Sequence, residues 1–261
     1  MTVRPPSPAP SRHAGAIHPV AKADEGTPGA HRRSHPGHHP PGADASGPMP
    51  TPLRDPGPML AATLDAWGGH DDLWIFGYAS LIWNPGFAAA EHRPARLTGW
   101  HRALKMWSRV NRGTPQQPGL VFALLPGGSC RGLVFRVPRA DGADTLRRLW
   151  GREMPTGVYD PRFLRCDTPH GPVRALAFTL SRRSPNFTGT LDPAQLRHIF
   201  SNASGRYGST LDYARLTLEH LQRHGIRDRA LHRLLRLAQG VGEESLPDHG
   251  PSAPSAPTPR P

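Results

Sequence analysis

The aromatic residues of this chain are confined to one continuous stretch, which limits where a folded core can form. All six tryptophans, eight phenylalanines and four tyrosines lie between Trp67 and Tyr213. Burial of such side chains supplies much of the free energy of folding, and a segment of this size can hold one sizeable core. The sequence therefore predicts a single folded domain over about residues 59–240.

The two ends of the chain have the opposite composition. Residues 1–55 hold 12 of the 32 prolines and almost no aliphatic clusters, and residues 241–261 are similar. Such segments cannot bury enough apolar surface to offset the entropy that ordering costs. We expect disordered tails at 1–55 and 241–261. The first is also rich in histidine, but its prolines and glycines fix no ligand geometry, so we expect no metal site there.

The formal net charge of +12 belongs to the central segment, because the charges of the two tails sum to zero. A positive surface attracts anionic partners of any size, so an acidic small molecule and a phosphate backbone both fit. The sequence contains no basic helix with interleaved aromatic residues. Nucleic-acid binding is therefore the least favoured hypothesis.

Two cysteines, Cys130 and Cys166, are present, and neither lies in a metal-ligand spacing. No disulfide framework is implied. The first twenty residues lack an apolar signal region, and no segment approaches the roughly 18 consecutive apolar residues of a membrane span. We expect a cytoplasmic protein without a membrane partner.

Strand-like runs precede most of the helix-like segments, which favours an α+β domain. Apolar runs separated by glycine and proline predict strands near 73–76, 95–107, 119–125, 131–137, 162–167 and 173–180. Apolar residues at helical spacing predict helices near 59–67, 142–153, 192–201 and 210–223, with another from Asp228. These patterns do not distinguish an open sheet from a small closed barrel.

Glu153 is the most informative acidic residue. It follows Leu146 by seven residues and Trp150 by three, so it lies on the apolar stripe of its predicted helix. Burial and the negative end of the helix dipole both raise the proton affinity of a carboxylate, which suits a general base. The alternative is a structural ion pair with an arginine such as Arg147 or Arg152.

Other candidate residues lie on loops or helices. The run Tyr78-Ala79-Ser80-Leu81 follows a predicted buried strand, where free backbone N–H groups commonly meet ligands. Arg112 could hold a substrate carboxylate, although in a chain with 30 arginines a solvated surface position is the default interpretation. No G-x-S-x-G, Walker or G-x-G-x-x-G pattern is present, so serine-hydrolase and common nucleotide-binding readings lack support.

Several segments together resemble the ChaC family of γ-glutamylcyclotransferases, over about residues 73–238. The strand-exit segment is similar to the family's F-G-Y-G-S-L-I-W-x-P-G-F signature, with Ala79 in place of a glycine. Further similar segments are Trp107-Ser108, Arg112-Gly113-Thr114-Pro115, Pro118-Gly119, Gly151-Arg152-Glu153-Met154, Gly157-Val158-Tyr159, Asp212-Tyr213 and Gly225-Ile226-Arg227-Asp228.

The resemblance implies a fold, a reaction and site residues. The fold is a small mixed β-barrel with flanking helices. The reaction converts glutathione to 5-oxoproline and cysteinylglycine without metal or organic cofactor, and Glu153 matches the catalytic glutamate. The implied substrate-binding residues are Tyr78, Ala79, Ser80, Leu81, Arg112, Tyr159 and Tyr213. A cyclotransferase for another γ-glutamyl compound, and a non-catalytic binding or regulatory protein on the same fold, remain as alternatives.

Overall fold

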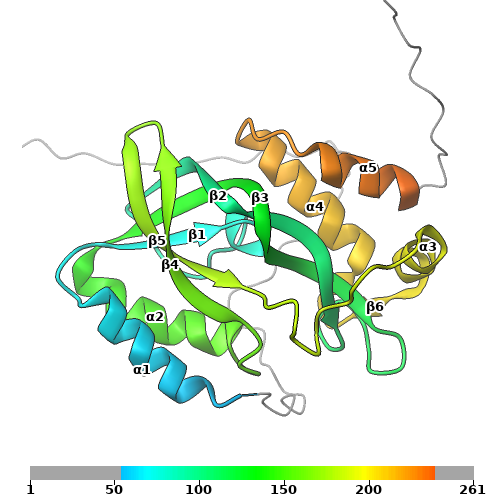
Figure 1. Ribbon diagram of the computed structural model, residues 1–261, viewed down its shortest axis with the longest axis horizontal. Helices are drawn as coiled ribbons and strands as arrows, with labels where there is room; N and C mark the ends of the chain where they lie inside the picture. Colours follow the sequence, from blue (N-terminus) through cyan, green and yellow to red (C-terminus); the bar gives the residue numbers. More distant parts are fainter. Residues whose placement is uncertain (1–53, 239–261) are drawn as a thin grey trace, which may run out of the picture. The chain divides into compact units, whose positions relative to one another are not determined.

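The computed structural model describes residues 54–238, which build a closed five-stranded β-barrel with helices around it (Figure 1). The α+β class and the barrel predicted from the sequence are confirmed. Apart from Arg54 and Asp55, the tails expected at 1–55 and 241–261 lie outside the described residues. No helix of residues 54–238 has the length and apolar character that crossing a membrane requires.

The barrel strands are hydrogen-bonded in the order β1-β3-β2-β4-β5. β1 closes the barrel by pairing parallel with β5, and the other pairs are antiparallel. The bounds are Leu73–Gly77 for β1, Glu91–Ser108 for β2, Gly119–Val137 for β3, Asp160–Thr168 for β4 and Gly171–Thr179 for β5. β1 is almost wholly buried, as its unbroken apolar run predicts.

β2 and β3 form one long antiparallel hairpin, from Glu91 opposite Arg136 to Ser108 opposite Gly119. The sequence predicted two strands, 119–125 and 131–137, where the structure has the single strand β3. Pairing with β2 continues through the intervening Pro-Gly-Gly segment with a change of register, so cross-strand hydrogen bonds override the local turn signal there.

The helices lie on two sides of the barrel. Figure 1 shows α1 and α2 together on one side, and α3, α4 and α5 on another. Their bounds are Pro56–Trp67, Arg139–Glu153, Pro193–Asn202, Thr210–Arg223 and Arg229–Ala238, in chain order. A short 3-10 helix, η1, spans Ser80–Ile82, and a two-stranded ribbon, β6 (Ser204–Gly205) with β7 (Gly208–Ser209), precedes α4.

Each group of helices covers its own apolar cluster. Leu146, Leu149 and Trp150 of α2 are buried against side chains of β1, β3 and β5. Leu221 of α4 and Leu231 of α5 belong to a second cluster with the opposite faces of the same strands. The two groups of helices therefore pack against different sides of the barrel, and the last residue of α2 lies at the barrel wall.

Candidate active site

Glu153 is the last residue of α2, and the amide of Met154 closes the helix by donating to the Trp150 carbonyl at 2.8 Å. The Glu153 side chain is 16% exposed, but its Oε1 atom is buried and has no hydrogen-bond donor among the described residues. Burial raises the pKa of this carboxyl. A buried carboxylate oxygen without a donor is costly, which makes Glu153 a candidate for a functional group.

Arg152 provides the nearest positive charge. Its Nε lies 3.0 Å from Glu153 Oε1, which is ion-pair distance, but the N–H does not point along a hydrogen bond to that oxygen. The rest of the guanidinium donates to the carbonyl of Asn84 and, at 3.3 Å, to Ser80 Oγ. The structural alternative, an ion pair with Arg152, is thus present in part, and it ties α2 to the loop after β1.

Three buried tyrosines interact electrostatically with the Glu153 carboxylate. Burial raises the pKa of Tyr78 and Tyr159 well above 10 and that of Tyr213 to about 12, and the charge of Glu153 acts in the same direction on all three. The Tyr78 hydroxyl donates to the Phe178 carbonyl at 3.0 Å. These three sequence-predicted residues, two from loops and one from α4, are therefore neutral phenols that interact with the charge of Glu153.

The loop after β1 begins at Gly77, where only glycine fits. An added Cβ would lie 2.9 Å from the Phe135 ring and 3.1 Å from Leu81 Cβ. The amide of Ile82 closes η1 by donating to the Ala79 carbonyl at 2.9 Å. The amides of Ser80 and Leu81 precede this first bond, so they remain open donors of a helical first turn among the described residues.

Arg112 lies beneath Tyr213. Its guanidinium is centred 4.9 Å from the Tyr213 ring and donates to the Tyr207 carbonyl, and the residue is 8% exposed. Glycines allow this packing, because an added Cβ at Gly113 would lie 2.0 Å from the Gly119 nitrogen. The structure thus gives Arg112 a contact with a candidate substrate-binding residue.

The sequence analysis did not identify the Arg102–Asp228 ion pair, called the Arg102–Asp228 clamp below, which contacts the loop after β1. Arg102 of β2 donates to the Tyr78 carbonyl at 2.6 Å and forms an ion pair with Asp228, with only 4% of the Arg102 side chain exposed. Asp228 also caps α5 by accepting from the Leu231 amide at 2.9 Å. Asp228 was singled out as a helix start and as part of a segment similar to the family, but not as a partner of Arg102, and nothing local distinguishes Arg102 from the other arginines.

This arrangement can bind a polar molecule and move a proton. Open amides of the loop suit a carboxylate or a developing oxyanion. A pKa that burial raises above the ordinary value suits a group such as Glu153 to take and return a proton. Within residues 54–238, no three His, Cys, Asp or Glu side chains gather in a way that could hold a metal ion.

Comparison with known proteins agrees with the geometry. A family described as "ChaC-like protein" matches residues 73–241. The chain belongs to this ChaC-like family. The matched segment includes β1, the loop, Glu153 and the Arg102–Asp228 clamp, so every residue of the candidate site lies within it.

Two curated relatives of this ChaC-like chain have closely related names. The glutathione-specific gamma-glutamylcyclotransferase of Escherichia coli (strain K12) is 35% identical over 72% of this chain and 82% of the relative. The Mus musculus glutathione-specific gamma-glutamylcyclotransferase 1 is 32% identical over 65% and 78%. A solved yeast γ-glutamyl cyclotransferase specific to glutathione has the same fold, with a TM-score of 0.60 at 18% identity over 67% of this chain and 99% of that one.

Proposed function

We propose that this protein is a γ-glutamylcyclotransferase that acts on glutathione. The observation that carries the proposal is the buried Glu153 Oε1 atom without a hydrogen-bond donor. The neighbouring Arg152 contacts Ser80 of the loop after β1, which carries the open amides. The ChaC-like relatives that are named for this activity support it. A structural glutamate would have its buried oxygens satisfied.

The reaction is an intramolecular cyclisation. The α-amine of the γ-glutamyl group attacks its own γ-carbonyl carbon, a new C–N bond closes a five-membered lactam, and the old amide C–N bond breaks. The products are 5-oxoproline and cysteinylglycine. Holding amine and carbonyl in contact supplies much of the acceleration, since an intramolecular attack avoids the entropy cost of a collision.

Glu153 moves the proton in this scheme. Its carboxylate removes a proton from the ammonium group, which frees the amine lone pair for attack, and then returns the proton to the departing amide nitrogen. After the attack the ring nitrogen loses a second proton, and the released amine takes up one proton to become an ammonium. The net proton count is unchanged. The amides of Ser80 and Leu81 hold the glutamyl carboxylate, and the neutral hydroxyls of Tyr159 and Tyr213 complete the polar wall of the site.

The decisive experiment incubates the purified full chain with glutathione and measures 5-oxoproline and cysteinylglycine. We expect both products in equal amounts, and a large loss of turnover in Glu153→Gln. Glu219→Gln is a matched control, because Glu219 is an exposed glutamate of α4. Binding of glutathione without product would favour a non-catalytic role.

Substrate choice is tested in the same assay. A second γ-glutamyl dipeptide replaces glutathione at equal concentration, and we expect a lower kcat/KM for it. Equal or better turnover of the second compound would reassign the substrate and leave the reaction class intact.

We also propose a cytoplasmic location without a nucleic-acid or membrane partner. Cell fractionation tests the location. Nucleic-acid binding, if it occurred, would weaken steeply with added salt, which a titration at two salt concentrations measures.

A further inference from the structure

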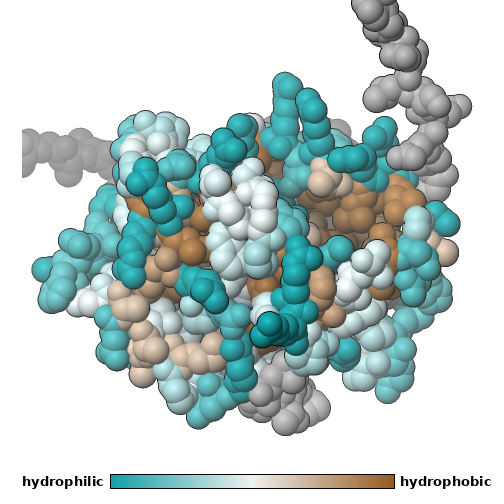
Figure 2. Space-filling model, viewed as in Figure 1, coloured by the Kyte–Doolittle hydropathy of each residue, from teal (hydrophilic) through white to brown (hydrophobic). Residues whose placement is uncertain are grey.

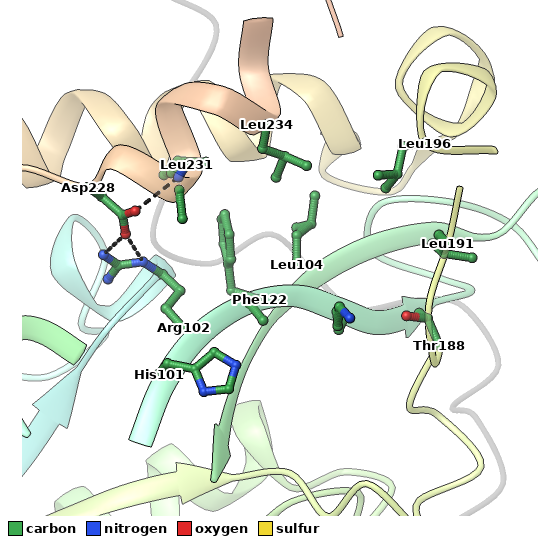
Figure 3. A pocket seen from close by; sticks show the side chains of 13 residues that line it. His101, Arg102, Leu104, Phe122, Thr188, Leu191, Leu196, Asp228, Leu231 and Leu234 are labelled. Carbon is green, nitrogen blue, oxygen red and sulfur yellow. Dashed lines mark hydrogen bonds and ion pairs between the residues drawn. The ribbon is translucent and has the colours of Figure 1, made fainter. Parts of the chain in front are cut away.

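A cavity lies between the β2–β3 hairpin and helices α3 and α5 (Figure 3). Its volume is about 260 Å³. Neither Glu153 nor any residue of the 78–81 loop lines it. The lining residues are His101, Arg102, Ala103, Leu104, Lys105, Phe122, Thr188, Leu191, Leu196, Asp228, Ala230, Leu231 and Leu234.

The walls of this cavity are mainly apolar. Figure 3 shows Leu104 and Phe122 of the hairpin facing Leu231 and Leu234 of α5, with Leu196 of α3 at one end. In the view of Figure 2, apolar surface gathers over the region of α5. Drug-sized ligands occupy pockets of roughly 300–1,000 Å³, so a smaller apolar body, such as one short chain or one ring, fits here.

A β-bulge in β2 contributes a lysine, Lys105, to the cavity lining. Ala103 pairs with Ala123 and Met106 with Val121, so two residues of β2, Leu104 and Lys105, oppose the single residue Phe122. All three bulge residues line the cavity. Bulges commonly redirect side chains beside functional sites. Lys105 is also the one lysine among residues 54–238, in a protein whose other described cationic side chains are arginine and histidine.

The charges around the cavity do not cancel. Asp228 is the one acidic residue of the lining, and it is already paired with Arg102. Lys105 has no acidic partner within ion-pair distance among the described residues. The cavity lining is therefore mainly apolar and includes one lysine that has no acidic partner among the described residues.

We propose that this cavity is a binding site for a small amphipathic anion, namely a monocarboxylate with a short apolar body. The apolar part lies between the hairpin and α5, and the carboxylate pairs with Lys105. An uncharged apolar ligand would leave Lys105 without a partner, and an apolar face of a second protein copy would do the same.

Calorimetry of the full chain with octanoate tests the proposal, with octan-1-ol as the uncharged counterpart. We expect saturable binding of octanoate and at least tenfold weaker binding of octan-1-ol, since hydrogen bonds to charged groups are roughly twice as strong as neutral ones. The measurement needs no turnover, so it stands or falls independently of the proposed reaction.

Three variants locate the site. Lys105→Gln should weaken octanoate binding about tenfold, and Leu191→Trp, which fills the cavity from a loop, should abolish it. Arg233→Gln removes a charge from α5 at a residue outside the cavity lining, and the affinity for octanoate should not change. Unchanged melting curves confirm that each variant folds. Equal affinity for octanoate and octan-1-ol, unaltered binding in Lys105→Gln, or a dimer that Leu191→Trp dissociates while octanoate does not bind, would each overturn the proposal.

Discussion

The Oε1 atom of Glu153 combines two properties that rarely occur together in a structural side chain. It is buried, and its nearest cation, Arg152, approaches within 3.0 Å without donating a hydrogen bond to it. In the proposed reaction the substrate ammonium supplies the missing donor, an interaction that a closed ion pair could not gain.

Glu153→Gln tests this difference. Glutamine has nearly the same shape but cannot accept a proton from the ammonium, so turnover should fall by about 100-fold to 10,000-fold. Thermal stability should stay close to that of the wild type, because the changed atom makes no hydrogen bond. Release of 5-oxoproline and the melting temperature are measured on the same preparation. A variant that melts early yet still turns over would contradict the catalytic role.

The pH dependence of stability provides an independent check. Burial raises the pKa of Glu153 in the folded protein above its ordinary value of 4.5. The folded state therefore binds this proton more tightly than the unfolded chain, and the resulting stability is complete below pH 4.5 and is lost as pH rises through the raised pKa. We expect melting curves of the wild type, compared with Glu153→Gln, to show this loss with rising pH. A constant difference between the two proteins across pH would contradict it.

Ala79→Gly restores the residue that the family signature has in the loop. Ala79 is 7% exposed, so its methyl group is close to other atoms. Glycine keeps the N–H and gives the substrate more room, so kcat/KM should match or exceed that of the wild type. A large loss of kcat/KM, measured with glutathione, would show that this chain uses the loop differently.

At the scale of elements, helices were easier to predict than strand ends. The apolar stripe and the glycine at 225 predicted 210–223, which are the observed bounds of α4. The Pro126-Gly127-Gly128 segment predicted a break between two strands, but the partner strand β2 keeps pairing through it. Local sequence shows where a chain can turn, whereas only the partner strand determines whether it does.

The junction between β2 and α5 makes a second element-scale prediction. Asp228→Asn keeps an oxygen to cap α5 but leaves the buried Arg102 without its counter-charge. Removing one partner of a buried pair typically costs about 3 to 5 kcal/mol, so the urea midpoint should fall clearly. KM for glutathione should rise too, because Arg102 also holds the Tyr78 carbonyl.

Asp192→Asn is the matched control for that variant. Asp192 caps α3 by accepting from the Gln195 amide at 2.8 Å, but it forms no ion pair among the described residues. Asparagine caps helices about as well as aspartate, so stability and KM should hardly change. Equal effects of the two substitutions would show that capping, rather than the ion pair with Arg102, is what matters.

At the scale of the molecule, the N-terminal boundary matters more than the sequence indicated. The first helix was predicted from residue 59, but α1 begins at Pro56, and the Pro56 carbonyl accepts from the indole of buried Trp150 at 2.8 Å. Arg54 reaches further, donating to the carbonyls of Gly157 and Tyr159. The contacts of Arg54 join the start of the domain to residues 157–159, a segment that carries the candidate site residue Tyr159.

Two shortened chains test this boundary. A chain of residues 54–240 should melt near the full-length protein, whereas one of residues 59–240 leaves the Trp150 indole without its acceptor. An unsatisfied buried group costs about 1–3 kcal/mol, and each kcal/mol lowers the melting temperature by roughly 2–4 °C in a domain of this size. Identical melting temperatures of the two chains would contradict the prediction.

A residue of the candidate site was predictable where its chemical type was unusual for its position within one segment. Glu153 stood out because an acid on an apolar stripe is unusual, and the tyrosines followed from the family motifs. Arg102 gave no such signal, because it is one of 30 arginines in the chain and its partners Tyr78 and Asp228 lie 24 and 126 residues away. Contacts of that separation are set by the way the loop after β1 and α5 pack against β2 rather than by any local pattern.

The Arg102–Asp228 clamp also bears on the order in which a cell makes this protein. Tyr78 and Asp228 leave the ribosome about 8 to 30 s apart at roughly 5–20 residues per second. Until Asp228 is synthesised, Arg102 is without its counter-charge, and α5 follows later still. The contacts that hold the loop after β1 are therefore complete only after residue 228 has left the ribosome, so a chain cut short before that residue would carry Glu153 and every loop residue and still lack the ion pair.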